Sequence, residues 1–278
     1  MNSTLKRSIS GVIFLAVMLG GLLYNEELYL ILFGLIIGYG MLREFYKMTL
    51  GEDYDFLQAC ARVSGIVLFW QAYKCFSGSR PLRYLVLVVL LLVLLLMIVS
   101  IFHKDHKQFL KTGYIYTGFL YIALPVALSN AVVFRGGEYS GLLMVAFFCI
   151  IWASDVGAYC FGMLFGRKLW PAKMCPSISP NKSWAGFLGG LVMALLAGAI
   201  LHWTGLFAFP MHHGLIVAAL MHVTGVLGDL FESLWKRAVG VKDSGNLIPG
   251  HGGLLDRFDS ALFAIPAGFV YLLIFHLV

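Results

Sequence analysis

The residues best suited to chemistry lie in one polar segment near the C-terminal end of the sequence. Positions 229–259 hold nine of the chain's 20 basic and 14 acidic residues. The acids are Asp229, Glu232, Asp243, Asp256 and Asp259, and the bases are Lys236, Arg237, Lys242 and Arg257. Carboxylates that bind a divalent cation, next to basic side chains that bind phosphate, would suit a reaction between two phosphates.

Three of these residues are spaced to share one face of a helix. Asp229, Glu232 and Lys236 stand at positions i, i+3 and i+7 inside or at the end of an apolar run. An ionised side chain in such a run is costly, so its presence indicates a function.

Two further acids begin the next apolar run. Because a hairpin joins the two runs, we expect Asp256 and Asp259 to approach Asp229 and to hold Mg²⁺, which uses one or two protein carboxylates together with substrate phosphates. An alternative interpretation stays open. In it, Asp229 and Asp256 form structural ion pairs with Lys236 and Arg257.

A glycine-rich stretch at 248–253 lies between these runs. Gly250, Gly252 and Gly253 let the backbone approach a ligand closely, as in loops that bind phosphate, although glycine clusters also form plain turns. His251 either contacts phosphate or caps the turn.

A second polar segment, 166–186, follows the intramembrane acid Asp155. Ser179 or Ser183 is expected to cap the next helix, whose first N–H groups would then point towards a ligand. Lys182 would lie at the helix start, where a cation is disfavoured, and an anionic ligand would remove that conflict. Asp155 either belongs to the site or is a buried hydrogen-bonding acid.

Membrane helices must position these segments. Of the 278 residues, 60% are hydrophobic and 12% are charged, whereas soluble domains carry about 25% charged residues. A soluble enzyme is therefore excluded. One span needs about 20 residues, and the apolar runs predict an all-α, polytopic membrane helical bundle of about nine transmembrane helices with no separate soluble domain. We place these helices at 8–24, 28–42, 57–73, 84–102, 114–133, 141–160, 185–208, 214–232 and 258–278.

The basic residues predict the orientation of the bundle. With nine spans, fifteen Lys and Arg fall on the side of the N terminus and four on the other side, so the N terminus is expected in the cytoplasm. We expect 1–140 to form a membrane scaffold. We expect 141–278 to form the catalytic region, with cytoplasmic loops at 166–184 and 233–257.

Three motifs together resemble a known family. The pattern S-x-x-K-R-x4-K-D runs from Ser233 to Asp243, and H-G-G-x-x-D-R-x-D runs from His251 to Asp259. With the upstream S-P-x-K-S-W-x-G stretch, these motifs resemble the signature of the phosphatidate cytidylyltransferases, also called CDP-diacylglycerol synthases. Ala185 departs from the polar residue often found in relatives, and the N-terminal half resembles the family by hydropathy alone.

The resemblance implies a reaction of CTP with phosphatidic acid that gives CDP-diacylglycerol and pyrophosphate. It implies Mg²⁺ held by Asp229 and Asp256, and a second cation, K⁺ or Mg²⁺. We assign catalytic roles to these two acids and to Lys236, Arg237, Lys242 and Arg257. The expected substrate-binding residues are Asp155, Ser179, Lys182, Ser183, His251, Gly252 and Gly253, and the expected orienting residues are Glu232, Asp243 and Asp259.

The expected partners are CTP, phosphatidic acid and the lipid bilayer, and a homodimer stays open. No nucleic-acid partner is expected, because cytoplasmic loops beside anionic lipid account for the net charge of +6. We expect a bacterial-type inner membrane protein with its active site facing the cytoplasm. Two alternatives are a CTP-dependent polyprenol or lipid-alcohol kinase, and an ion-coupled secondary transporter that uses Asp155 and Asp229.

Overall fold

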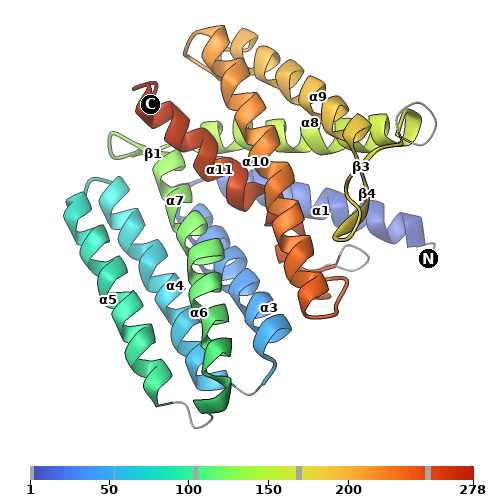
Figure 1. Ribbon diagram of the computed structural model, residues 1–278. Coiled ribbons are helices and arrows are strands. Elements are labelled where there is room, and N and C mark those ends of the chain that lie inside the picture. Colours follow the sequence, from blue (N-terminus) through green and yellow to red (C-terminus); the bar gives the residue numbers. More distant parts are fainter. Residues whose placement is uncertain (1–2, 53, 103–105, 167–170, 248–251) are drawn as a thin grey trace. The chain divides into compact units, whose positions relative to one another are not determined.

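The protein consists of two compact units (Figure 1). The computed structural model describes residues 3–52, 54–102, 106–166, 171–247 and 252–278. The first unit comprises Met1–Gly141 and Asp243–Arg257, and the second comprises Leu142–Lys242 and Phe258–Val278. The segment Asp243–Arg257, which we expected in the C-terminal catalytic region, thus packs with the N-terminal helices.

The predicted class of a helical membrane protein is confirmed. All nine predicted apolar runs are helical over most of their described residues. Within the part of the chain that the structure describes, seven helical stretches are long and apolar enough to span a membrane, namely Glu26–Leu50, Leu82–Ile101, Phe109–Val133, Leu142–Leu164, Trp184–Trp203, Met211–Ala238 and Leu255–Ile274. The other two runs correspond to the shorter apolar helix Ser10–Leu23 and to the helix Asp55–Phe76. The latter helix carries Gln58, Arg62 and Gln71, which lower its hydropathy.

The first unit is built from helices that run from the N terminus to a short β-hairpin. Its elements are α1 (Ser3–Leu23), α2 (Glu26–Tyr29), η1 (Leu30–Gly38), α3 (Tyr39–Leu50), α4 (Asp55–Phe76), α5 (Leu82–Ile101), η2 (His106–Thr112), α6 (Gly113–Gly118), η3 (Phe119–Ala123), α7 (Leu124–Val133), β1 (Phe134–Arg135) and β2 (Glu138–Tyr139). Helix α4 packs against α5 and α7 (Figure 1).

Buried aromatic side chains hold the first unit together. Tyr29 is fully buried, contacts the rings of Phe33 and Phe69, and shares a hydrogen bond of 2.7 Å with Ser129. The Tyr46 hydroxyl donates to the carbonyl of Ile115 at 3.0 Å. These partners satisfy the buried hydroxyl groups, whose desolvation would otherwise oppose folding. This packing holds α3 in place. Helix α3 carries Glu44, whose carboxylate binds backbone N–H groups at the start of α11 (Leu255–Ile274).

The second unit consists of four helices and one small hairpin. Its elements are α8 (Leu142–Leu164), β3 (Lys173–Cys175), β4 (Ser179–Ser183), α9 (Trp184–Trp203), α10 (Met211–Ala238) and α11 (Leu255–Ile274), whose first turn belongs to the first unit. Helix α9 packs against both α8 and α10. A Cβ at Gly157 would lie 2.7 Å from the Gly189 carbonyl oxygen, so small residues let α8 and α9 approach closely.

The β3–β4 hairpin was not predicted. It is antiparallel, with Lys173 opposite Ser183 and Cys175 opposite Ser179. Strand β3 has only three residues, and the five residues of β4 include a proline. Neither strand alternates regularly between polar and apolar residues, so the hydropathy pattern did not predict them. The hairpin leads directly into α9 and fixes the residues before that helix.

Candidate active site

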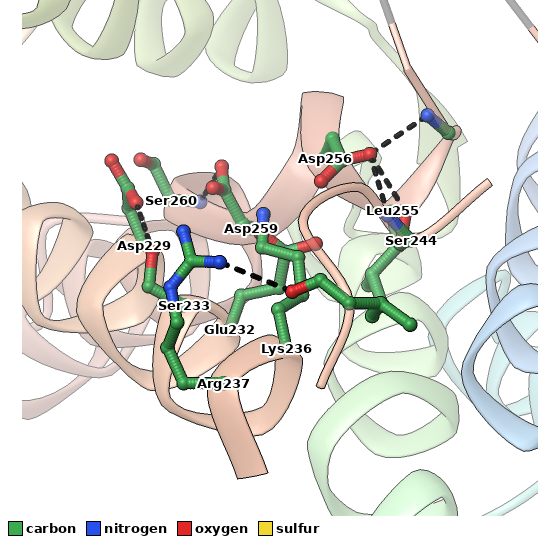
Figure 2. A network of polar contacts seen from close by, with 12 residues as sticks. Asp229, Glu232, Ser233, Lys236, Arg237, Ser244, Leu255, Asp256, Asp259 and Ser260 are labelled. Carbon is green, nitrogen blue, oxygen red and sulfur yellow. Dashed lines mark hydrogen bonds and ion pairs between the residues drawn. The ribbon is translucent and has the colours of Figure 1, made fainter. Parts of the chain in front are cut away.

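The predicted polar face of α10 is present in the structure. Asp229, the first acid on this face, pairs with Lys182 of the β3–β4 hairpin. Asp229, Glu232 and Lys236 all lie on this helix. Lys182 Nζ lies 2.7 Å from Asp229 Oδ2. Ser233 Oγ donates to Asp229 Oδ1 at 3.3 Å (Figure 2). The Lys182 and Asp229 side chains are 22% and 36% exposed, so solvent and solutes can reach this ion pair.

A second ion pair on the same helix is buried. Lys236 Nζ donates to Glu232 Oε2 at 2.5 Å, and Glu232 is fully buried. The alternative interpretation predicted a structural pair of Asp229 with Lys236. The structure pairs Asp229 with Lys182 and Lys236 with Glu232, which is a different arrangement.

The predicted helix cap before α9 is Ser183. Its hydroxyl accepts a hydrogen bond from the Gly186 N–H at 3.1 Å, and its backbone is extended as a cap requires. Ser179 lies at the start of β4. Lys182, which precedes the cap, is disfavoured by the helix dipole but is stabilised by the Asp229 carboxylate. The Asp229 carboxylate thus offsets the unfavourable position of Lys182 at the helix start, where an anionic ligand was expected to do so.

Asp259 of α11 interacts electrostatically with three other carboxylates of the second unit. Asp229, Glu232 and Asp155 all lie close enough to Asp259 to interact with it electrostatically, and Asp259 Oδ1 accepts the Ser260 N–H at 2.6 Å (Figure 2). Asp155 is exposed on α8, so its interpretation as a buried acid is wrong. Repulsion among these acids would fall if a cation bound beside them.

The chemistry of these acids fits Mg²⁺. Carboxylate oxygen is the ligand that this hard cation prefers, and one or two such groups suffice when phosphates and water complete the octahedron. Among the described residues, no group of three or more His, Cys, Asp or Glu side chains is placed so that it could hold a metal ion.

In the first unit, Asp256 is bound by donors from the loop that precedes α11. Its Oδ2 accepts the Ser244 N–H at 3.0 Å, the Ser244 hydroxyl at 2.9 Å and the Gly253 N–H at 2.7 Å (Figure 2). Three donors on one oxygen orient the carboxylate, as is usual for carboxylates that bind metal. Gly252, at φ +84°, allows the turn that places Gly253 beside this acid.

The remaining predicted residues differ in their surroundings. Arg237 donates from Nε to the Ile178 carbonyl at 3.3 Å and from Nη1 to the Val241 carbonyl at 3.1 Å, which ties the hairpin to the end of α10. Arg237 is exposed, and so are Lys242, Asp243 and Arg257. His251 lies outside the described residues.

The carboxylates that we expect to bind metal belong to different units. Asp229 and Asp259 lie in the second unit and Asp256 lies in the first, so their convergence on one metal ion stays a prediction.

Sequence reasoning missed Glu44 of α3, which accepts the N–H groups of Leu254 and Leu255. The position of Glu44 could have identified it, because it is an acid near the end of an apolar run, as is Asp229.

Known proteins resemble the chain along nearly its whole length. A model of the cytidylyltransferase family matches residues 5–275. The chain belongs to the cytidylyltransferase family. A phosphatidate cytidylyltransferase of Staphylococcus saprophyticus is 33% identical over 266 residues, which cover 95% of each chain. The phosphatidate cytidylyltransferase of Bacillus subtilis is 40% identical over 177 residues, which cover 63% of this chain and 62% of that protein.

Membership of the cytidylyltransferase family confirms the resemblance seen in the motifs. A shorter match, 46% identical over 133 residues, covers 46% of this chain and 45% of the phosphatidate cytidylyltransferase of Haemophilus influenzae. The match from residue 5 also places the N-terminal half in the family, although its residues alone resembled the family only in hydropathy.

Proposed function

We propose that this membrane protein transfers a cytidylyl group from CTP to phosphatidic acid, giving CDP-diacylglycerol and pyrophosphate for phospholipid biosynthesis. One observation carries the proposal. The family model spans residues 5–275, and a relative named phosphatidate cytidylyltransferase aligns over 95% of both chains. The match therefore includes both units and every residue to which we assign a role.

The proposed reaction is an in-line displacement at phosphorus. A phosphate oxygen of phosphatidic acid attacks the α-phosphorus of CTP and forms a new P–O bond. The bond from the α-phosphorus to the oxygen that bridges to the β-phosphorus breaks, and pyrophosphate leaves with that electron pair. Because the attacking oxygen is already anionic, no strong general base is needed, and catalysis consists mainly of alignment and charge neutralisation.

In this proposal, Lys182 is the residue that exchanges partners. Its ammonium group pairs with Asp229 and is partly exposed, so it can turn to a phosphate oxygen. Bound Mg²⁺ would neutralise the triphosphate and hold it in a fixed orientation. Asp229 and Asp256 would ligate that ion, while Lys242 and Arg257 are exposed and can bind the pyrophosphate or the lipid phosphate.

We also propose where the reaction takes place. The bias of Lys and Arg supports a cytoplasmic N terminus and an active site that faces the cytoplasm of a bacterial inner membrane. CTP is water-soluble and phosphatidic acid is held in the bilayer, so a site at this surface is accessible to both. A homodimer is a further expectation, tested by the mass of the detergent-solubilised protein.

The deciding experiment supplies purified protein with Mg²⁺, with CTP labelled either in the base or in the γ-phosphate, and with either phosphatidic acid or a polyprenol as the lipid acceptor. The proposal predicts that the base label enters the lipid and that the γ-label leaves as pyrophosphate. Transfer of the γ-label to a lipid alcohol would identify a kinase. Absence of lipid labelling, together with ion-coupled uptake into proteoliposomes, would identify a transporter. Exchanging K⁺ for a large organic cation at constant Mg²⁺ tests the second cation.

A further inference from the structure

A carboxylate of α3 binds the first backbone N–H groups of α11 within the first unit. Glu44 Oε1 accepts the Leu254 N–H at 2.9 Å, and Glu44 Oε2 accepts the Leu255 N–H at 2.8 Å. Helix α11 begins at Leu255, so these two N–H groups are among those that find no acceptor within the helix. Glu44 thus caps α11 from a different helix.

The position of Glu44 makes this contact strong. It lies within the candidate span Glu26–Leu50, where an ionised carboxylate is costly unless donors replace water. Both of its oxygens accept backbone N–H groups at the positive end of α11, and hydrogen bonds to a charged acceptor are stronger than neutral ones. The charge therefore finds at the start of α11 the donors that it requires.

Ser244 links Glu44 to the predicted metal ligand. Its hydroxyl lies 2.9 Å from Asp256 Oδ2 and 3.4 Å from Glu44 Oε2. Two glycines leave the room for this arrangement. A Cβ at Gly253 would lie 2.6 Å from Glu44 Oε2, and a Cβ at Gly245 would lie 2.7 Å from Glu44 Oε1. Any side chain at either position would push the Glu44 carboxylate away.

We propose that Glu44 is a positioning residue for nucleotide transfer, which acts by holding the first turn of α11 and thereby the Asp256 carboxylate. In this proposal Glu44 acts through the backbone that it binds and is not itself a ligand of the substrate or the metal. It fixes the backbone of Leu254 and Leu255, and with it the side chains of Asp256 and Arg257 that follow directly. The proposal rests on the cytidylyl transfer proposed above, although the contact itself can be tested without that reaction.

The test compares Glu44→Gln with the matched control Glu52→Gln, which changes an exposed carboxylate in the turn after α3. An amide can accept one of the two N–H groups, but its own NH₂ group then faces the other. Three quantities are measured on each full-length protein in detergent: hydrogen exchange of a peptide covering 252–258, kcat, and the Mg²⁺ concentration that gives half-maximal rate.

For Glu44→Gln we expect faster exchange at 252–258, a kcat reduced by about 10- to 100-fold, and a raised Mg²⁺ midpoint, as is typical when a partner of a metal ligand is lost. Glu52→Gln should match the wild type in all three. Wild-type exchange in Glu44→Gln would overturn the proposal. A lower kcat at an unchanged Mg²⁺ midpoint would also overturn it, because Glu44 would then not act through Asp256.

A second variant covers the case in which Glu44→Gln does not fold. In Gly245→Ala the new Cβ would lie 2.7 Å from Glu44 Oε1 and 2.9 Å from its Cδ, so the carboxylate must move although its charge is kept. We expect faster exchange at 252–258 and a raised Mg²⁺ midpoint. Wild-type values of both in this variant would overturn the proposal. If the wild type shows no cytidylyl transfer, the proposed function fails, while the exchange measurement still decides whether Glu44 holds α11.

Discussion

The two units hold their carboxylates in different ways. In the first unit, backbone N–H groups and the Ser244 hydroxyl bind Glu44 and Asp256. In the second unit, lysine ammonium groups bind Asp229 and Glu232. A backbone donor cannot leave without local unfolding, whereas a lysine on a flexible stem can move to another anion. The first arrangement therefore fixes geometry, and the second allows partners to be exchanged.

The sharpest test of this contrast compares Asp229→Asn with Asp256→Asn. Both should lower kcat by about 100- to 1,000-fold, because each removes a charge that stabilises the reacting phosphates. Only Asp256→Asn should also lower the midpoint of thermal unfolding, since hydrogen bonds to a charged acceptor contribute about 1.5–3 kcal/mol each. Near-normal turnover by Asp256→Asn at low Mg²⁺ would exclude its metal role. Equal loss of stability in both variants would remove the contrast.

The second unit also contains a buried ion pair of Glu232 with Lys236, and its burial leads us to expect a structural role for Lys236 in place of the catalytic role that the motif suggested. Glu232→Gln removes one partner of the buried pair with Lys236 and should cost about 3–5 kcal/mol of stability. Thermal unfolding in detergent measures this loss. The matched double variant, Glu232→Leu with Lys236→Met, should regain most of it, because apolar side chains of similar size replace a buried pair at little cost. A single variant as stable as the wild type would contradict this interpretation.

In the first unit, a methyl group at a glycine should disturb the carboxylates. In Gly253→Ala, the new Cβ would lie 2.2 Å from Ser244 Oγ and 2.6 Å from Glu44 Oε2. We expect a loss of about 1–3 kcal/mol in stability from this overpacking, measured by thermal unfolding. The control Gly113→Ala adds its Cβ to open space at the start of α6 and should leave stability nearly unchanged.

The smallest expected effect concerns the cap that precedes α9. Ser183→Ala should cost about 1 kcal/mol, because the Gly186 N–H loses its side-chain acceptor. Ser183→Asn keeps a capping oxygen and should retain most of the stability. Equal unfolding midpoints for Ser183→Ala and the wild type would show that the cap contributes nothing measurable to the hairpin that carries Lys182.

What the sequence could reveal depended on how local each feature is. Hydropathy marks the spans, and spacing along one helix places Asp229, Glu232 and Lys236 on a common face, because both properties arise within a few turns of chain. The Ser183 cap is equally local. Glu44 binds N–H groups 210 and 211 positions away, and no pattern along the chain encodes that pairing.

The partner of Lys182 was missed for a related reason. Sequence spacing favoured Lys236 as the partner of Asp229, since both lie on α10. Tertiary packing brings Lys182 to Asp229 from the β3–β4 hairpin. The motifs thus indicated the chemistry, whereas the choice of partner among several lysines required the folded unit.

If Asp229 and Asp256 serve one metal-dependent reaction, both must contribute to the binding of the metal. Mn²⁺ can replace Mg²⁺ and is detected by electron paramagnetic resonance in the presence of CTP. We expect Asp229→Asn and Asp256→Asn each to weaken Mn²⁺ binding by about 10-fold or more. Wild-type Mn²⁺ affinity in either folded variant would show that this carboxylate does not bind the metal.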